Sequence, residues 1–243
     1  MSSNRLYGPY STYKKIVDQL ILERKITITA DGSSSIFLPE WNEQYHSKHG
    51  AITEAQHVFI KNGLHCLLSK NNAKEINILE IGFGTGLNAF LTLFEAERLR
   101  LNICYDAVEA YPVTLDDVNS LNYSKIFPEG KDYFLKMHQH NWEESHPITT
   151  TFQLKKRKIL FEEIEDKDVF DLIYFDAFGA RVQPELWTVA IFQKMFDALK
   201  NQGILVTYSA KGSVRRAMQE VGFTVEKLVG PPGKREMLRA NKI

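Results

Sequence analysis

The chain has 243 residues, which is within reach of one α/β domain with an extension. Hydrophobic residues make up 44% and charged residues 25%, as is ordinary for a soluble globular protein. The 30 basic and 30 acidic residues balance, so the overall charge gives no general attraction to nucleic acid, and such binding would need local patches.

Four further absences in the sequence narrow the class of protein. Cys66 and Cys104 show no CxxC or Cys/His ligand spacing and the histidines form no metal-like cluster, so we expect neither a disulfide scaffold nor a metal. The amino terminus lacks an apolar core of signal-peptide length, and no stretch approaches the ~18 apolar residues of a membrane span. We therefore expect a cytoplasmic protein with no membrane partner.

Residues 1–50 are predicted to form a β-rich extension, and residues 51–243 the main domain. In "KITITADGSSSIFLP", two apolar or β-branched runs flank Asp31, Gly32 and a serine cluster, which predicts a hairpin. Thr53 is positioned to cap a helix through residue 70, where apolar residues recur at helical spacing.

The next segments alternate between strand and helix. "INILEIG" reads as a strand, "LNAFLTLFEAERLR" as a helix, "LNICYDAVEA" as a second strand and "VTLDDVNSL" as a short helix. Residues 123–170 are polar and give no clear pattern. Their basic run "KKRK", residues 155–158, is interpreted as a solvated loop or an edge strand.

The last third continues the alternation. "DLIYFDAF" is a strand, a helix opens at Pro184 and ends at residues 201–203, "GILVTYSA" is a strand and "GSVRRAMQEVG" a helix. "FTVEKLVG" and "REMLRAN" read as two strands joined by "PPGK". The order predicts an α/β fold: a mostly parallel sheet with helices on both faces and a closing antiparallel hairpin.

Ligands of such sheets bind beyond the carboxyl ends of the strands, where "GFGTG" follows the first of them. An acid, Glu109, ends the next strand and could accept both ribose hydroxyls of a nucleoside. Nicotinamide enzymes prefer GxGxxG, with a helix end cradling pyrophosphate. The spacing here favours a nucleoside cofactor without pyrophosphate, and S-adenosylmethionine fits best. The alternative is a tight turn that binds nothing.

Asp176 ends the third clear strand and would project into the cleft beside the cofactor. It could hold an amine and take its proton, since an amine must be neutral at nitrogen to attack a sulfonium methyl. The alternative is a strand-end aspartate that caps the following loop.

Several cations lie near the same edge and could contact nucleic-acid phosphates. They are Lys211, Arg215, Arg216, Lys234, Arg235 and Arg239. The alternative is ordinary solvated charge. The three tryptophans, Trp41, Trp142 and Trp187, could stack on a base but are more typical of core.

Five segments together resemble one family: "YHSKHGAITEAQHVF", "GFGTGLN", "VEAYPVT", "DAFGARVQPELW" and "VRRAMQEVGFTVEKLVGPPGKREML". From about Tyr45 to Leu238 the chain is similar to the methyltransferase part of the tRNA wobble-uridine enzyme MnmC, including its stand-alone forms. The resemblance implies a Rossmann-like fold. It also implies S-adenosylmethionine-dependent N-methylation of 5-aminomethyl-(2-thio)uridine at the tRNA wobble position.

The resemblance also implies roles for individual residues. Asp176 matches the acid beside the reacting amine. Cofactor binding is assigned to Tyr45, Glu54, Gly82, Phe83, Gly84, Thr85, Gly86, Asn88, Glu109 and Glu162. Contacts to the substrate, the anticodon stem-loop of tRNA, are assigned to Phe178, Lys211, Arg215, Arg216, Lys234 and Arg235. An FAD oxidase domain follows in bifunctional members; we expect that activity to be absent here, so another enzyme would supply the aminomethyl substrate.

The sequence departs from the family pattern at three places. Ala110 stands where a basic residue often follows the ribose-binding acid, "DAFGAR" replaces the commoner "DGFAP", and Glu162 is a weak match for the acid that contacts adenine. Two alternatives therefore stay open. One is a methyltransferase for another amine, protein or RNA acceptor, and the other is a non-catalytic nucleoside- or RNA-binding module on the same fold.

Overall fold

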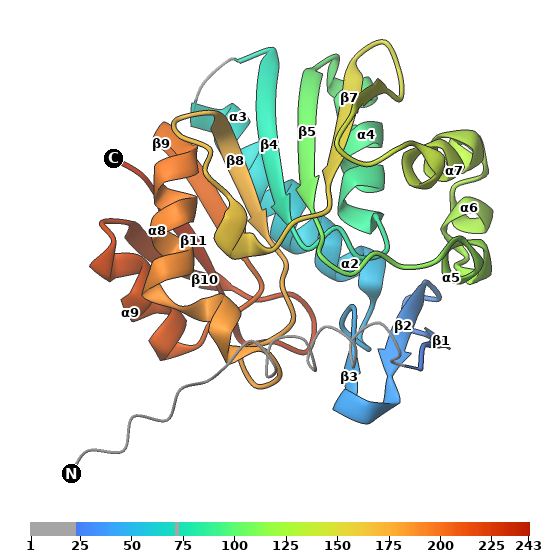
Figure 1. The fold of residues 1–243 in the computed structure, drawn as a ribbon, viewed down its shortest axis with the longest axis horizontal. Helices are drawn as coiled ribbons and strands as arrows, with labels where there is room; N and C mark the ends of the chain where they lie inside the picture. The colour runs from blue at the N-terminus through green and yellow to red at the C-terminus, as the bar shows by residue number, and fades with distance from the viewer. Residues whose placement is uncertain (1–22, 71–72) are drawn as a thin grey trace.

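The computed structural model describes residues 23–70 and 73–243. In this part of the chain the main sheet has the strand order β10-β11-β9-β8-β4-β5-β7-β6 (Figure 1). Its strands are β4 (Glu75–Ile81), β5 (Asn102–Val108), β6 (Ser145–Pro147), β7 (Phe152–Arg157), β8 (Phe170–Phe175), β9 (Leu199–Thr207), β10 (Thr224–Val229) and β11 (Glu236–Asn241). The central strands β9, β8, β4, β5 and β7 run parallel, whereas β10, β11 and β6 pair antiparallel. The predicted mostly parallel sheet with its closing hairpin is confirmed.

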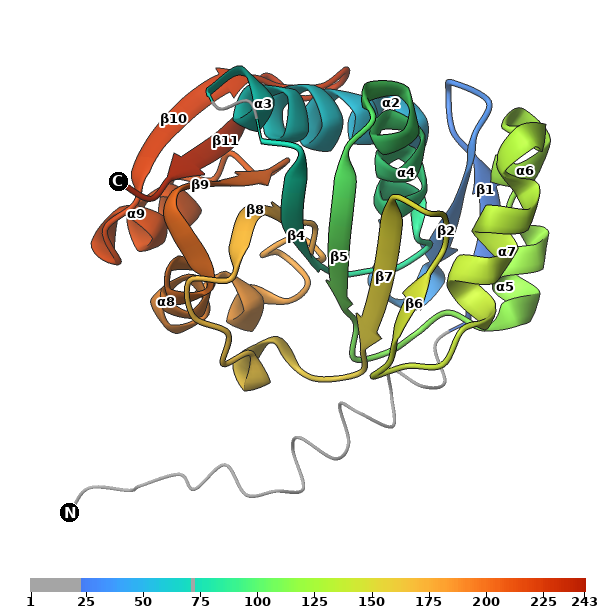
Figure 2. The same cartoon turned by 90° about the horizontal axis from the view of Figure 1, so that it is seen from above.

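Helices cover both faces of the sheet, as Figure 2 shows. The larger ones are α4 (Leu87–Leu99), α7 (Lys131–Gln139), α8 (Val189–Ala198) and α9 (Gly212–Glu220), with short helices α5 (Leu115–Ser120) and α6 (Tyr123–Ile126). Strand alternation divides the core between the two faces. Tyr174 belongs to the cluster under α4, and Phe175 to the cluster under α8.

A continuous helical rod crosses the α4 face of the sheet. It consists of α2 (Ala51–Ala55), the π-helix η2 (Gln56–His65) and α3 (Cys66–Lys70). Thr53 does not cap it, because the helix begins two residues earlier, at Ala51. Instead, the Asp31 carboxylate from the predicted hairpin accepts hydrogen bonds from both the backbone N and the Oγ1 of Thr53, each at 2.9 Å. The capping group therefore comes from a distant segment, which local sequence spacing does not reveal.

The basic run 155–158 is neither a solvated loop nor an edge strand. Its first three residues lie in β7, which pairs with both β5 and β6. Alternation along β7 turns Lys156 inward, where it is 2% exposed. Its Nζ donates to the carbonyl of His138 at 2.9 Å and lies 4.9 Å from the Trp142 ring centroid. The hydrogen bond to this carbonyl and the contact with the aromatic ring explain how the Lys156 amine is tolerated in a buried position.

The helix after Pro184 also starts later than expected. Residues Pro184–Trp187 form a 3-10 turn, η5, and α8 begins after Thr188, whose Oγ1 accepts the backbone N–H of Ile191. Trp187 is buried, as predicted, while Trp41 and Trp142 pack partly buried against the core.

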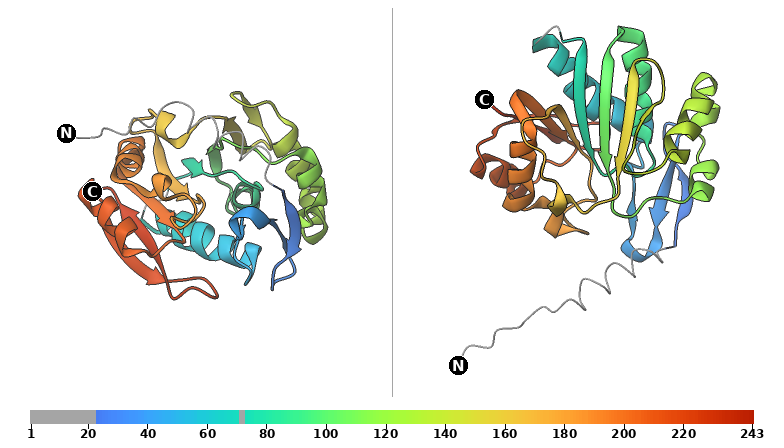
Figure 3. Two further views of the ribbon diagram at one scale, coloured as in Figure 1. Left: turned by 60° about the horizontal axis from the view of Figure 1, so that its bottom comes forward. Right: turned by 45° about the horizontal axis from the view of Figure 1, so that its top comes forward.

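The amino-terminal segment forms a separate antiparallel sheet, β1 (Lys25–Ile28), β2 (Ser34–Leu38) and β3 (Glu43–Gln44), so the predicted hairpin is confirmed. This sheet lies beside α5–α7 and below the carboxyl ends of the central strands (Figure 3). The backbone N of Ser34 donates to Asn122 Oδ1 at 2.8 Å, and Tyr123 OH donates to the Ser34 carbonyl at 2.8 Å. Among the described residues, no helix is long and apolar enough to cross a membrane.

Candidate active site

A cavity of about 790 Å³ lies between the strand ends and the amino-terminal sheet. Most of the residues assigned to the site from the sequence line it. They are Tyr45, Glu54, Gly82, Phe83, Gly84, Thr85, Asn88, Glu109, Glu162, Asp176, Phe178 and Lys234. The remaining five, Gly86, Lys211, Arg215, Arg216 and Arg235, lie outside its lining.

The glycine turn brings the chain close to two neighbouring segments. Gly82 has φ +90°, and a Cβ there would lie 2.8 Å from the carbonyl oxygen of Asp176. Gly84 has φ +49°, and its Cβ would lie 3.1 Å from the Tyr45 ring. Only glycine adopts such conformations without strain and leaves room for these approaches. Gly86 instead backs the turn, where a Cβ would lie 2.8 Å from His138 Nε2.

Glu109 is held by the same turn. Its carboxylate accepts the backbone N–H of Gly84 at 3.1 Å and that of Tyr111 at 2.9 Å, one on each oxygen. Burial raises the pKa of this carboxyl against the lowering by those two hydrogen bonds. Each oxygen retains further lone-pair capacity, so the group can still accept from vicinal hydroxyls of a ribose.

Asp176 follows β8 directly and is fixed on two sides. Its backbone N donates to the Ile81 carbonyl at 2.9 Å, and its Oδ2 accepts from Asn88 Nδ2 at 2.8 Å. Burial, and then the nearby Glu54 carboxylate, raise the pKa of Asp176 to about 7, while Asn88 and Lys234 oppose the rise. A carboxyl that titrates near neutrality suits a general base.

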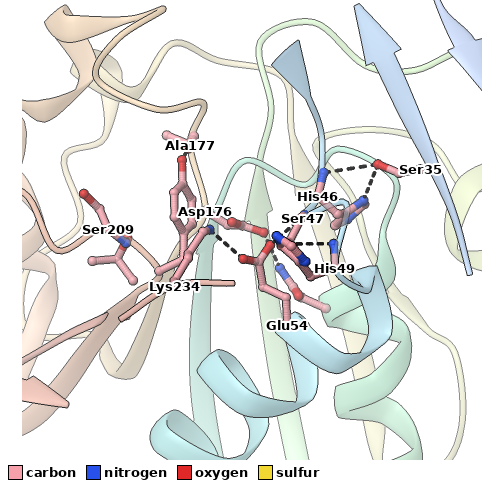
Figure 4. Close-up of polar contacts among 12 residues, drawn as sticks. Ser35, His46, Ser47, His49, Glu54, Asp176, Ala177, Ser209 and Lys234 are labelled. Atoms are coloured by element: carbon pink, nitrogen blue, oxygen red, sulfur yellow. Dashed lines mark hydrogen bonds and ion pairs between the residues drawn. The ribbon is translucent and has the colours of Figure 1, made fainter. Parts of the chain in front are cut away.

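An ion pair sits beside Asp176, as Figure 4 shows. Lys234 Nζ lies 2.6 Å from Glu54 Oε2 and 3.8 Å from the centroid of the Tyr208 ring. The other oxygen of Glu54 accepts the backbone N–H of Ser47 at 3.0 Å. Lys234, assigned to tRNA from the sequence, therefore lies within the cavity.

Sequence reasoning missed Tyr208 as a site residue. Its hydroxyl donates to the carbonyl of Ala177 at 2.8 Å, and its ring lines the cavity under Lys234. Tyr208 directly follows β9, which ends at Thr207, so it stands at a strand end where ligands of such sheets bind.

Aromatic side chains form one wall of the cavity. The Phe178 ring makes edge contacts with Trp41 and Tyr45, at centroid distances of 5.6 and 4.9 Å. Trp187 Nε1 donates to the Phe178 carbonyl at 2.8 Å and fixes that loop from behind. The amino-terminal segment thus supplies Trp41 and Tyr45 to this wall, which offers faces on which a planar base could stack.

The adenine-contacting acid stays a prediction. Glu162 lies in the 3-10 turn η4 (Phe161–Glu163), is exposed, and borders the cavity with the apolar side chains of Leu160, Phe161 and Ile191.

The cavity is acidic, and the exposed cations lie elsewhere. Its lining carboxyl groups are Glu43, Glu54, Glu109, Glu162, Asp176 and Glu185, against the cations Arg24, Lys48 and Lys234. Such a lining favours cationic ligands. Lys211, Arg216 and Arg235 are exposed outside the cavity, Arg215 is half-buried, and Arg239 pairs with Glu226 at 3.0 Å.

Comparison with known proteins agrees with this geometry. Residues 129–243 match a family described as S-adenosyl-L-methionine-dependent methyltransferase. A protein of Aromatoleum aromaticum, named tRNA 5-methylaminomethyl-2-thiouridine biosynthesis bifunctional protein MnmC, is 29% identical over 88% of this chain and 35% of its own. A protein of the same name from Burkholderia thailandensis is 27% identical over 90% of this chain and 35% of its own. The chain thus spans about a third of the length of these relatives.

Solved structures show the same fold. The crystal structure of MNMC2 from Aquifex aeolicus has a TM-score of 0.70, 23% identity, and covers 99% of this chain and 78% of its own. Spermidine synthase from Thermotoga maritima has a TM-score of 0.57, 16% identity, and covers 92% of this chain and 70% of its own.

The family match over residues 129–243 makes this chain similar to one class of protein, the S-adenosyl-L-methionine-dependent methyltransferases. The acidic lining of the cavity fits a cationic cofactor, and the glycine turn with Glu109 fits the ribose of a nucleoside. Within that class its relatives are the MnmC proteins, and the resemblance predicted from the sequence is confirmed.

Proposed function

We propose that the chain methylates the primary amine of 5-aminomethyl-(2-thio)uridine at the wobble position of tRNA, giving 5-methylaminomethyl-(2-thio)uridine. The observation that carries the proposal is Asp176, a carboxyl group with a pKa of about 7 in an acidic cavity beside the glycine turn. The names of the sequence relatives supply the tRNA substrate.

Different residues of the cavity bind the cofactor, orient the substrate base and take the proton. Glu109 and the backbone of Gly84 hold the nucleoside end of the cofactor, which supplies a methyl group activated by a positive sulfur. Phe178 stacks against the uracil ring and orients it. Tyr45, whose ring lies against Gly84, contacts the cofactor. The Asp176 carboxylate accepts a hydrogen bond from the incoming amine and takes its proton, so that the nitrogen lone pair faces the methyl group. Positioning then supplies most of the rate.

The exposed cations of α9 and of the β10–β11 loop are proposed to bind tRNA phosphates. Lys211, Arg216 and Arg235 are exposed outside the cavity, at the same strand-end edge. Such contacts orient the nucleic acid without reading its sequence. The proposed substrate is cytoplasmic, and its aminomethyl group must be made by another enzyme activity.

The test is methyl transfer from radiolabelled S-adenosylmethionine to tRNA from cells that lack this gene. Label in 5-methylaminomethyl-uridine, identified by mass spectrometry, supports the proposal. Cofactor binding without label in tRNA would refute the tRNA substrate and leave a methyltransferase for another acceptor. Absence of cofactor binding as well would favour the non-catalytic module.

Asp176→Asn should keep cofactor affinity and lose most turnover, because an amide cannot take the amine proton. A drop of about 100-fold or more in kcat is expected for loss of a positioned base. Isothermal calorimetry with the cofactor controls for folding, and full turnover in the variant would refute the assigned role.

A further inference from the structure

Asn88 joins two carboxyl groups through one amide nitrogen. Its Nδ2 donates to Asp176 Oδ2 at 2.8 Å and to Glu80 Oε1 at 2.9 Å. Glu80 lies on β4, in the strand that leads into the glycine turn, and is 0% exposed, whereas Asp176 faces the cavity. Two carboxylates on one buried amide repel each other, so the fully enclosed one is the one kept neutral.

Within residues 23–70 and 73–243, no cation is among the groups that act on Glu80. Its second oxygen, the Oδ1 of Asn88 and the hydroxyl of Tyr105 are buried without a close hydrogen-bond partner among the described residues. The Tyr105 hydroxyl still acts on Glu80 as a hydrogen-bond donor that lowers its pKa, against the larger effect of burial. The charged and titratable groups that act on Glu80 are Asp176, Tyr105 and Glu109, and those that act on Asp176 are Glu54 and Lys234. Burial and the Asp176 charge both raise the pKa of Glu80 well above its ordinary value.

We infer that Glu80 is a positioning residue for the proposed reaction: as a neutral carboxylic acid it anchors the Asn88 amide, which in turn orients the Asp176 carboxylate. The inference rests on the proposed function for its role in turnover, but not for its protonation state. A neutral Glu80 accepts from Asn88 without adding a second negative charge behind Asp176. Asp176 then keeps one fixed oxygen and presents the other to the amine.

Two substitutions separate anchoring from charge. Glu80→Leu removes one of the two acceptors that hold the Asn88 amide, so the orientation of Asp176 is less well fixed, and it should lower kcat about 10- to 100-fold, the cost of a misplaced catalytic group. Glu80→Gln keeps a neutral acceptor and should recover most of that loss, with the acid midpoint of the pH–kcat profile within ~0.3 of that of the parent enzyme, because no charge is removed. A downward shift of about one unit in Glu80→Gln would show that Glu80 is ionised and overturn the inference.

A double-mutant cycle tests the route through Asn88. In an Asn88→Ala background, Glu80→Leu should cost less than about threefold in kcat, because the bridge is already broken. If the loss of kcat in the double variant equals the product of the losses in the two single variants, Glu80 acts independently of Asn88.

Infrared difference spectroscopy reads the protonation state directly and needs no tRNA. The stretch of a protonated carboxyl group should persist at pH 8 in the parent protein and in Asp176→Asn, and vanish in Glu80→Gln. Its absence from the parent protein at pH 8 overturns the inference even if Glu80→Leu fails to fold. A persistent band without methyl transfer to tRNA would instead refute the proposed substrate alone.

Discussion

Asp176 lies beside an ion pair whose two charges shift its pKa in opposite directions. Glu54 raises the pKa of Asp176, whereas Lys234 lowers it. The base is the ionised form, so kcat/KM should rise with pH through a midpoint near the pKa of about 7. Glu54→Gln should lower that midpoint and Lys234→Met should raise it, each by on the order of one unit. Shifts in the same direction would contradict the electrostatic account.

Ionisation of Asp176 should also lower the free energy of unfolding of the protein. Its pKa is raised from 3.8 to about 7, so the folded state favours the protonated form, and the free energy of unfolding falls as pH rises between these values. Asp176→Asn cannot ionise. It should raise the free energy of unfolding at pH 8 by a few kcal/mol, at most about 4, and by less at pH 5. Urea denaturation at both pH values measures this, and equal effects would contradict the assigned pKa.

At the scale of elements, the β10–β11 loop delivers Lys234 to the cavity by packing against the amino-terminal segment. Gly233 has φ +83°, and a Cβ there would overlap the His49 ring. The matched glycine, Gly32, has φ +82° with nothing within 4 Å of its Cβ position. Both alanine variants carry the backbone strain, but only Gly233→Ala adds the clash.

Gly32→Ala should therefore cost ~1–2 kcal/mol of stability and leave kcat/KM unchanged. Gly233→Ala should cost more, by ~1–3 kcal/mol, and lower kcat/KM because Lys234 is displaced. Adding His49→Ala should restore much of that loss. No rescue by His49→Ala would place the effect in the backbone alone.

The same elements show what the sequence could predict. The alternation of strands and helices, the hairpins and the glycine turn follow from local spacing, and they sufficed to place Asp176 and Glu109 at one sheet edge. The cap of α2 by Asp31, the inward turn of Lys156 and the capture of Lys234 by Glu54 depend on partners far away in sequence. No local pattern encodes such contacts.

At the scale of the whole molecule, Asp31 ties the amino-terminal sheet to the rod. Besides Thr53, its carboxylate accepts from the backbone N and Oγ of Ser33 and the Oγ1 of Thr29. These bonds outweigh burial and hold the pKa of Asp31 well below its usual value. The stabilisation is therefore present above the ordinary aspartate pKa and is lost as pH falls below it.

Asp31→Ala should lower the free energy of unfolding at pH 7 by ~2–3 kcal/mol and weaken cofactor binding, because the sheet that closes the cavity loses its anchor. Asp132→Ala, at an exposed carboxylate in the first turn of α7, is the control and should cost under ~0.5 kcal/mol. Calorimetry and denaturation measure both. Unchanged cofactor affinity in Asp31→Ala would show that the sheet stays in place without this anchor.

The contact between Glu54 and Lys234 joins residues 180 positions apart in the chain. Contacts of such separation form late, because the intervening chain must be ordered before closure is rewarded. The parallel strands and their helices can thus be in place before Lys234 reaches Glu54 and closes the part of the cavity beside Asp176. During refolding, secondary structure should return first and affinity for the cofactor only afterwards, so that a chain acquires its chemistry in its last folding step.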